Sequence, residues 1–125
     1  MNFLLDTHVL LWWLGGHVSL SKTVHRMMSD GTNLIFVSAA TAWEISIKQT
    51  LGKLQAPNDL EDALRLSGFL CLPISIAHAL LAERLPPHHD DPFDRLLVAQ
   101  AKIEKLTLVT RDPKQILYDI STLLA

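Results

Sequence analysis

Short apolar runs separated by helical patterns are the feature that most restricts the fold of this chain. The first run, Phe3–Leu5, shows no alternation of apolar and polar residues, which is typical of a parallel strand buried on both faces. Three further runs predict strands at Leu34–Val37, Phe69–Leu72 and Thr107–Val109. Because strands alternate with helices, the sequence predicts an α/β domain around a mostly parallel sheet.

Most of the helices between these strands are expected to begin at a serine, asparagine or aspartate, whose side chain caps the first turn. Glycine stands where two of the helices end. The expected helices are Val9–Leu14 before Gly15 and Gly16, one from Ser19 or Ser21 to Met28, Ala39 to about Leu51 between Ser38 and Gly52, one from the Asn58 cap to about Leu66, Ile76 to about Leu85 after Ser75, and one capped by Asp91. The tail from Ile116 to Leu124 is expected to form either a short helix or an edge strand.

Length, charge and cysteine content narrow the possible functions. A chain of 125 residues with a net charge of -2 fits one domain, residues 1–125, and does not bind nucleic acid by charge alone. A nucleic-acid substrate would need a local basic patch or a metal ion between phosphate and acid. The single cysteine, Cys71, allows no disulfide within the chain and is expected in the core. With no signal-peptide pattern and no membrane-spanning run, a cytoplasmic protein is expected.

The stretch from His88 to Ala101 starts a helix with more acids than capping requires. Asp91 suits the N-cap and Pro92 suits the first helical position. Asp94 then lies in the first turn, where the helix dipole favours a negative charge and is expected to keep this acid ionised. Because one acid is enough to cap a helix, Asp94 needs partners elsewhere in the chain to explain it.

Four carboxylates are expected at or near the carboxyl ends of the strands, where parallel sheets bind their ligands. Asp6 ends the first strand, Asp112 follows the last confident strand, and Asp94 and Glu44 lie in nearby helices. Like charges brought together repel unless a cation lies among them. Oxygen ligands suit Mg²⁺ or Mn²⁺, ions that can activate water for attack on a phosphodiester.

Each acid also has a purely structural explanation. Asp6 can cap the following helix, Asp112 can cap a short helix, and Glu44 can pair with Lys48 one turn later. Glu44, however, has apolar neighbours that are unusual for a solvated helix face. The recurrence of all four acids at one edge of the sheet favours a shared site.

Histidines offer a different metal site. His88 and His89, with Asp90 and Asp91, could hold zinc, but adjacent histidines in a proline-rich loop do not have a standard ligand spacing. We favour a loop that organises the entrance of the acidic site.

Tryptophans and arginines could contact a nucleic acid. Trp12, Trp13 and Trp43 could stack on bases, although tryptophans at helical spacing more often belong to a core. Arg95 and Arg111 each flank an acid and could contact phosphate, but ion pairs with those acids are favoured slightly. No glycine-rich phosphate loop and no Gly-x-Ser-x-Gly nucleophile motif occurs.

These residues together resemble a known family, the PIN-domain ribonucleases, and specifically the VapC-type toxins of bacterial type II toxin–antitoxin systems. The likeness covers almost the whole chain. Its motifs are Leu4-Leu5-Asp6-Thr7-His8 with Leu10-Leu11-Trp12, Ser38 with Trp43-Glu44-Ile45, Lys48 with Leu51-Gly52-Lys53-Leu54, Leu85-Pro86 to His89, Asp91-Pro92-Phe93-Asp94-Arg95-Leu96-Leu97 with Ala99-Gln100-Ala101, and Leu108-Val109-Thr110-Arg111-Asp112.

The resemblance implies a PIN-like three-layer α/β/α fold and an acidic site for Mg²⁺ or Mn²⁺ at Asp6, Glu44, Asp94 and Asp112. It further implies metal-dependent cleavage of RNA, a homodimer, and a cognate antitoxin protein whose C-terminal segment binds near the site. Thr7 and Thr110 match positions near that site. Trp12, Trp13 and the helices after the second strand are expected to supply apolar area for a dimer.

Two alternatives belong to other classes. A magnesium-binding receiver domain of signalling proteins has a similar length and an acidic pocket, but it needs an aspartate at the end of a central strand and a lysine after a late strand. Here those strands end at Ser38, Pro73 and Thr110-Arg111-Asp112. The second alternative is a catalytically silent, PIN-like binding or regulatory module that acts only through its partner.

Overall fold

The computed structural model describes residues 1–16 and 19–125, and its centre is a five-stranded sheet. The strands are β1 (Asn2–Leu5), β2 (Leu34–Ser38), β3 (Leu70–Leu72), β4 (Thr107–Thr110) and β5 (Thr122–Leu124). They lie in the order β3-β2-β1-β4-β5, and all four pairings are parallel. The predicted parallel sheet is therefore confirmed, with β1 at its middle.

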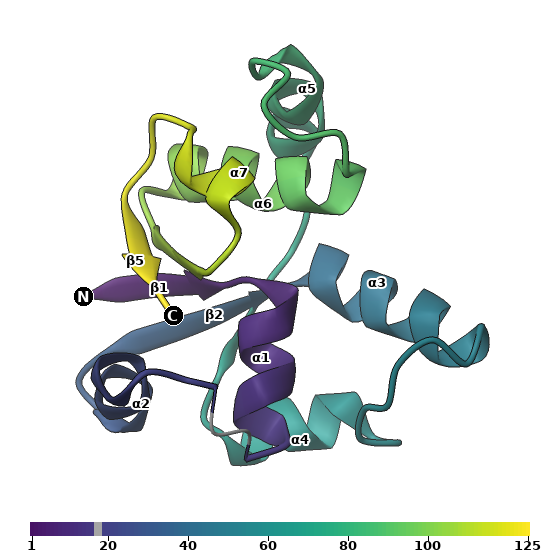
Figure 1. Cartoon of the computed structure of the whole chain (residues 1–125), viewed down its shortest axis with the longest axis vertical. Helices are drawn as coiled ribbons and strands as arrows, with labels where there is room; N and C mark the ends of the chain where they lie inside the picture. The colour runs from purple at the N-terminus through teal and green to yellow at the C-terminus, as the bar shows by residue number, and fades with distance from the viewer. Residues whose placement is uncertain (17–18) are drawn as a thin grey trace.

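Helices cover both faces of this sheet, as the apolar character of the first strand predicts (Figure 1). They are α1 (Thr7–Leu14), α2 (Lys22–Ser29), α3 (Ala39–Thr50), α4 (Leu60–Leu66), α5 (Ile76–Arg84), α6 (Pro92–Glu104) and α7 (Pro113–Ile116). In Figure 1, α5, α6 and α7 lie on one side of β1 and β2, whereas α1, α2 and α4 lie on the other. This is the expected three-layer α/β/α arrangement.

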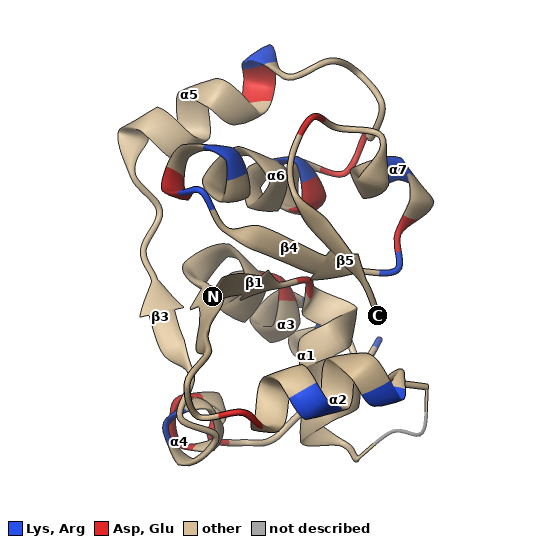
Figure 2. Cartoon of the chain, turned by 90° about the vertical axis from the view of Figure 1, so that its left-hand side faces the viewer, with Lys and Arg blue, Asp and Glu red and all other residues tan. Residues whose placement is uncertain are grey.

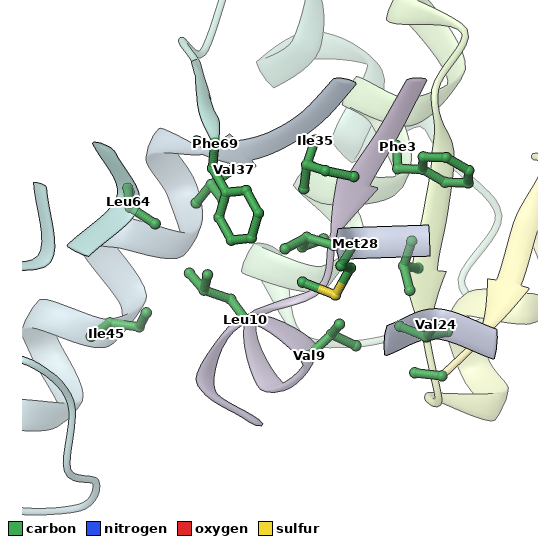
Figure 3. Close-up of a cluster of buried hydrophobic side chains, with 13 residues drawn as sticks. Phe3, Val9, Leu10, Val24, Met28, Ile35, Val37, Ile45, Leu64 and Phe69 are labelled. Atoms are coloured by element: carbon green, nitrogen blue, oxygen red, sulfur yellow. The ribbon is translucent and has the colours of Figure 1, made fainter. Parts of the chain in front are cut away.

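Alternate side chains of β1 feed two separate cores, because successive residues of a strand point to opposite faces. Phe3 and Leu5 pack with Val9 and Met28 in the core shown in Figure 3. Leu4 packs on the other face with residues of α6 and β4. Since each face of β1 is sealed by helices, the strand is held firmly and its carboxyl end is a fixed point for the residue that follows.

The strand order excludes the receiver-domain alternative. Receiver domains share the flavodoxin-like order 2-1-3-4-5, whereas β1 is the central strand here and lies between β2 and β4. In the described part of the chain, none of the helices has the length and apolar character needed to cross a membrane.

Three details differ from the sequence predictions. The cap of α4 is Asp59, not Asn58, because the Asp59 carboxylate accepts the Asp62 amide at 3.0 Å. The tail forms both a short helix, α7, and an edge strand, β5, where either one was expected. Cys71 is exposed and not in the core, because β3 is an edge strand with β2 as its neighbour.

Candidate functional site

Asp6 lies at the carboxyl end of the central strand and also caps α1. Its Oδ1 accepts the Thr7 amide at 2.8 Å, and its Oδ2 accepts the Thr110 hydroxyl, at the end of β4, at 3.2 Å. The residue is only 5% exposed. Asp6 thus performs the predicted capping role while its second oxygen faces the neighbouring strand end.

Glu44 comes from α3 and is buried, as its apolar neighbours indicated. Its Oε1 accepts the Thr7 hydroxyl at 2.6 Å, and its Oε2 accepts Lys48 Nζ at 2.9 Å. The expected ion pair with Lys48 is therefore present. Thr7 links the two acids, because its amide donates to Asp6 and its hydroxyl donates to Glu44.

Asp94 lies in the first turn of α6, whose cap is supplied by Asp91. Asp91 Oδ1 accepts the amides of Phe93 at 2.8 Å and Asp94 at 3.3 Å. The Asp94 side chain is thereby released from capping, and its Oδ2 lies 2.9 Å from His89 Nε2. Among the described residues, none donates a hydrogen bond to Asp94 Oδ1, which leaves this oxygen available to a ligand.

Asp112 follows β4 and has two tasks, like Asp6. Its Oδ1 accepts the Lys114 amide at 2.8 Å and caps α7. Its Oδ2 lies 2.7 Å from His89 Nε2. Gln115, a buried residue of α7 that sequence reasoning missed, accepts the Thr110 hydroxyl at 2.6 Å and donates to the Asp94 carbonyl at 3.3 Å. It fixes α7 against the start of α6.

The four acids are close enough to change one another's ionisation. Burial is the largest cause that raises the pKa of Asp94 to about 8. The remaining causes of this raised pKa are the negative charges of Asp6, Asp91, Glu44 and Asp112. The helix dipole, which was expected to help keep Asp94 ionised, is outweighed by burial and repulsion in the metal-free protein.

Asp6 responds to the same surroundings. Burial raises its pKa to about 6, and Asp112 adds to this rise. His8 and hydrogen bonds from Thr7 and Thr110 lower the pKa of Asp6 but do not cancel the effect of burial. Two acids of one cluster thus keep their protons to higher pH than an ordinary aspartate, and a bound divalent cation would lower both pKa values. The oxygen donors suit Mg²⁺ or Mn²⁺.

His89 is the main feature of the site that the sequence did not place. Its Nε2 lies between Asp94 and Asp112, and the donor atoms of these three residues all lie within 4.8 Å of one another. The less favoured alternative, a zinc site that includes His88, has no support, because the His88 ring packs edge-on against Tyr118 at 4.9 Å. The loop does organise the acidic site, as favoured, but it does so by inserting His89 into it.

Comparison with known proteins identifies the fold family. A model of the PIN domain family matches residues 3–121. The chain belongs to the PIN domain family. The resemblance found in the sequence motifs is thereby confirmed.

Individual proteins extend this PIN-domain comparison. Ribonuclease VapC16 of Mycobacterium tuberculosis (strain ATCC 25618 / H37Rv) is 40% identical over 62 residues, which cover 46% of this chain and 43% of that protein. The matched segment thus covers less than half the length of this curated relative.

Known structures share the PIN fold over nearly the full chain. The crystal structure of VapBC2 from Rickettsia felis bound to a DNA fragment from their promoter has a TM-score of 0.70 and 18% identity, with 98% of both chains covered. A toxin-antitoxin complex from Klebsiella pneumoniae has a TM-score of 0.66 and 19% identity, with 98% of this chain and 96% of that chain covered. At these identities the likeness shows the fold alone.

Arg95 and Arg111 do not form the ion pairs that were favoured for them, as far as the described residues show. Arg95 Nη2 donates to the carbonyls of Ala82 at 2.7 Å and Leu85 at 3.1 Å, and Arg95 Nη1 donates to the carbonyl of His89 at 3.2 Å. The prediction was wrong because the last carbonyls of α5 lack partners within their helix and need a donor. Arg95 therefore fixes the loop that carries His89.

Arg111 likewise binds carbonyls, those of Ser19 and Ala125, and its guanidinium lies 4.3 Å from the centre of the Trp12 ring. Trp12 and Trp13 pack against the core, as expected. Trp43 does not, because its indole is 62% exposed and meets Phe93 edge-on at 5.4 Å. Trp43 precedes Glu44 and Phe93 precedes Asp94, so this aromatic pair borders the acidic cluster.

Proposed function

We propose that this PIN domain is a metal-dependent endoribonuclease and the toxin of a toxin–antitoxin pair. The observation that carries the proposal is the convergence of four carboxylates. Burial, together with the negative charges of the neighbouring acids, raises the pKa of Asp94 to about 8. Two similarities support this assignment: the partial sequence match to Ribonuclease VapC16 and the fold shared with a toxin-antitoxin complex. The proposed site residues are Asp6, Glu44, Asp94 and Asp112.

The proposed mechanism divides the work among these acids. Asp6, Asp94 and Asp112 hold one or two Mg²⁺ or Mn²⁺ ions, and Glu44 acts directly or through a water. When bound, the metal would neutralise the scissile phosphate, activate a water and stabilise the negative charge that develops during cleavage. Asp94 must release its proton to bind metal, because its pKa in the metal-free protein is about 8.

Charge distribution explains why metal is needed to hold RNA. The net charge is -2, and in Figure 2 the basic residues are scattered over α2, α5, α6 and α7 without forming one basic face in that view. RNA phosphates would be repelled by the acidic cluster without a cation. Affinity for RNA then depends on the metal ion and on uncharged contacts near the site.

Trp43 is the strongest candidate for such an uncharged contact, because an exposed indole at the border of the site can stack on an unpaired base. We expect Trp43→Ala to raise KM for RNA about tenfold and to leave kcat little changed, since base stacking contributes roughly 1–3 kcal/mol. Steady-state cleavage of a fluorescent oligoribonucleotide measures both constants. Trp43→Phe, which keeps an aromatic face, should retain most of the affinity, and an unchanged KM in Trp43→Ala would contradict this role.

The test of the proposed function is incubation of the purified chain with total cellular RNA, with Mg²⁺ or Mn²⁺ and with chelator. Discrete fragments that require the metal are the expected result. Metal binding without any cleavage would instead favour a silent module that acts through its partner. Cleavage that persists in chelator would contradict a metal-dependent site.

An antitoxin is the proposed protein partner, and a basic segment of it could dock at the acidic site. Large apolar side chains on α3, α4 and α5 are exposed and available to a partner, among them Trp43, Leu66, Ile76 and Leu80. A homodimer remains a prediction. Trp12 and Trp13 contribute less to it than expected, because both are partly buried against the core of their own chain.

A further inference from the structure

His89 is fixed in place by contacts that do not involve the acidic cluster. Its amide donates to the Tyr118 hydroxyl at 3.0 Å, and its carbonyl accepts Arg95 at 3.2 Å. Its Nδ1 accepts the Asp91 amide at 3.0 Å. The ring is therefore oriented by its own loop and by the cap of α6, and its side chain is only 11% exposed.

The contact with Asp91 decides which ring nitrogen carries the proton. A nitrogen that accepts an N–H must present a lone pair, so in a neutral imidazole the proton lies on the other nitrogen. His89 therefore carries its proton on Nε2. This nitrogen donates to Asp112 Oδ2 at 2.7 Å and lies 2.9 Å from Asp94 Oδ2, and in this orientation it has no lone pair for a metal ion.

We propose that His89 is a positioning residue of the acidic site, whose Nε2–H donates to Asp112 and lies against Asp94, and which holds the two acids at a fixed spacing without ligating the metal. The inference rests on the proposed function, because it assigns the spacing to a metal site. The two acids come from different elements, α6 and the turn before α7, and repel each other when both are ionised. An N–H group between them offsets this repulsion and keeps one oxygen of each acid near the same nitrogen.

Direct ligation by His89 would require a different arrangement. Nε2 would have to lose its proton and Nδ1 would have to gain one, which would place two N–H groups of His89 and Asp91 head to head at 3.0 Å. Turning the ring over would also break the contact between Nδ1 and the Asp91 amide. The hydrogen bonds therefore favour an all-oxygen ligand set with an imidazole behind it.

Nitrogen-15 NMR of the full chain tests the tautomer directly. We expect a proton on His89 Nε2 in the metal-free protein, and we expect it to remain there when Mg²⁺ is added. Loss of this proton with a shift of Nε2 on addition of Mg²⁺ would show ligation and overturn the proposal. This measurement needs no variant and no RNA.

Calorimetric titration with Mn²⁺ tests the positioning role. His89→Ala is expected to lower Mn²⁺ affinity about 10- to 100-fold, the range typical of residues that orient metal ligands. His89→Gln, whose amide N–H can replace Nε2–H, should recover most of that affinity. His88→Ala is the matched control. The His88 ring packs on Tyr118 and not on the acids, so this substitution should leave Mn²⁺ affinity unchanged.

The outcomes separate the two proposals. Wild-type affinity in His89→Ala would overturn the positioning role and leave the metal site standing. Failure of the wild-type chain to bind Mn²⁺ would overturn the metal-dependent function and with it this inference. A His89→Gln variant as weak as His89→Ala would also contradict the role of the Nε2–H donor.

Discussion

Asp94→Asn is expected to lower the rate of RNA cleavage about 10³-fold, because metal ions contribute several kcal/mol of charge stabilisation and each 1.36 kcal/mol is a tenfold change in rate. Asparagine keeps the size of Asp94 but removes the negative charge that a metal ligand needs. It also resembles the protonated form that this acid favours without metal, since the pKa is about 8. The fold should therefore survive, and single-turnover cleavage of a defined RNA in Mn²⁺ measures the loss.

The control for this change is Asp119→Asn, which removes an exposed acid between α7 and β5. It should cleave at the wild-type rate and should exclude an effect of net charge. Thermal unfolding of both variants checks the fold. Wild-type cleavage by Asp94→Asn, in a preparation freed of contaminating nuclease, would remove Asp94 from the proposed mechanism.

The metal-free protein is expected to lose stability as the pH rises from about 5 to about 9. The folded pKa of Asp94 is about 8 and that of Asp6 is about 6, against 3.8 for an ordinary aspartate. The folded state then binds more protons than the unfolded state, so the free energy of unfolding falls with pH. The contribution is fully present below pH 3.8 and is lost as the pH passes the folded values. The expected loss is several kcal/mol, measured by urea denaturation in chelator.

Two comparisons isolate the cause of this pH dependence. Mg²⁺ should restore stability most strongly at the alkaline end, because metal replaces the protons that these acids release there. Asp94→Asn should flatten the profile in chelator, whereas Asp119→Asn should leave it unchanged. A stability that rises with pH over this range would show that the acids are not held in a buried, mutually repelling cluster.

The sheet could be predicted because local signals and tertiary packing agree. Phe3–Leu5 is apolar at every position, and β1 lies at the centre of the sheet with helices on both faces. Cys71 was misplaced because an apolar run does not reveal which strand becomes an edge. Asp59 displaced Asn58 as a cap because two adjacent residues can both cap a helix, and only the path of the chain selects one.

The site was predictable in part for a related reason. Asp6 and Asp112 follow strands that end at the same edge, so the sequence places them near each other. The position of His89 depends on a loop that Arg95 shapes through carbonyl contacts, and residue spacing does not encode those contacts. The exposure of Trp43 likewise depends on how α3 meets α6, which helical periodicity alone did not reveal.

The double use of Asp6 and Asp112 has a consequence for how such a protein can change over generations. In each residue one oxygen accepts an amide that starts a helix, while the other faces the acidic cluster. Asparagine caps a helix about as well as aspartate, so an Asp→Asn change can keep the cap. The same change removes the charge and replaces the second oxygen, which accepts from Thr110 in Asp6 and from His89 in Asp112, by an NH2 group. A descendant with such a change would keep its fold and lose a charge that the proposed metal site needs. Activity and stability can therefore be lost separately at these two positions.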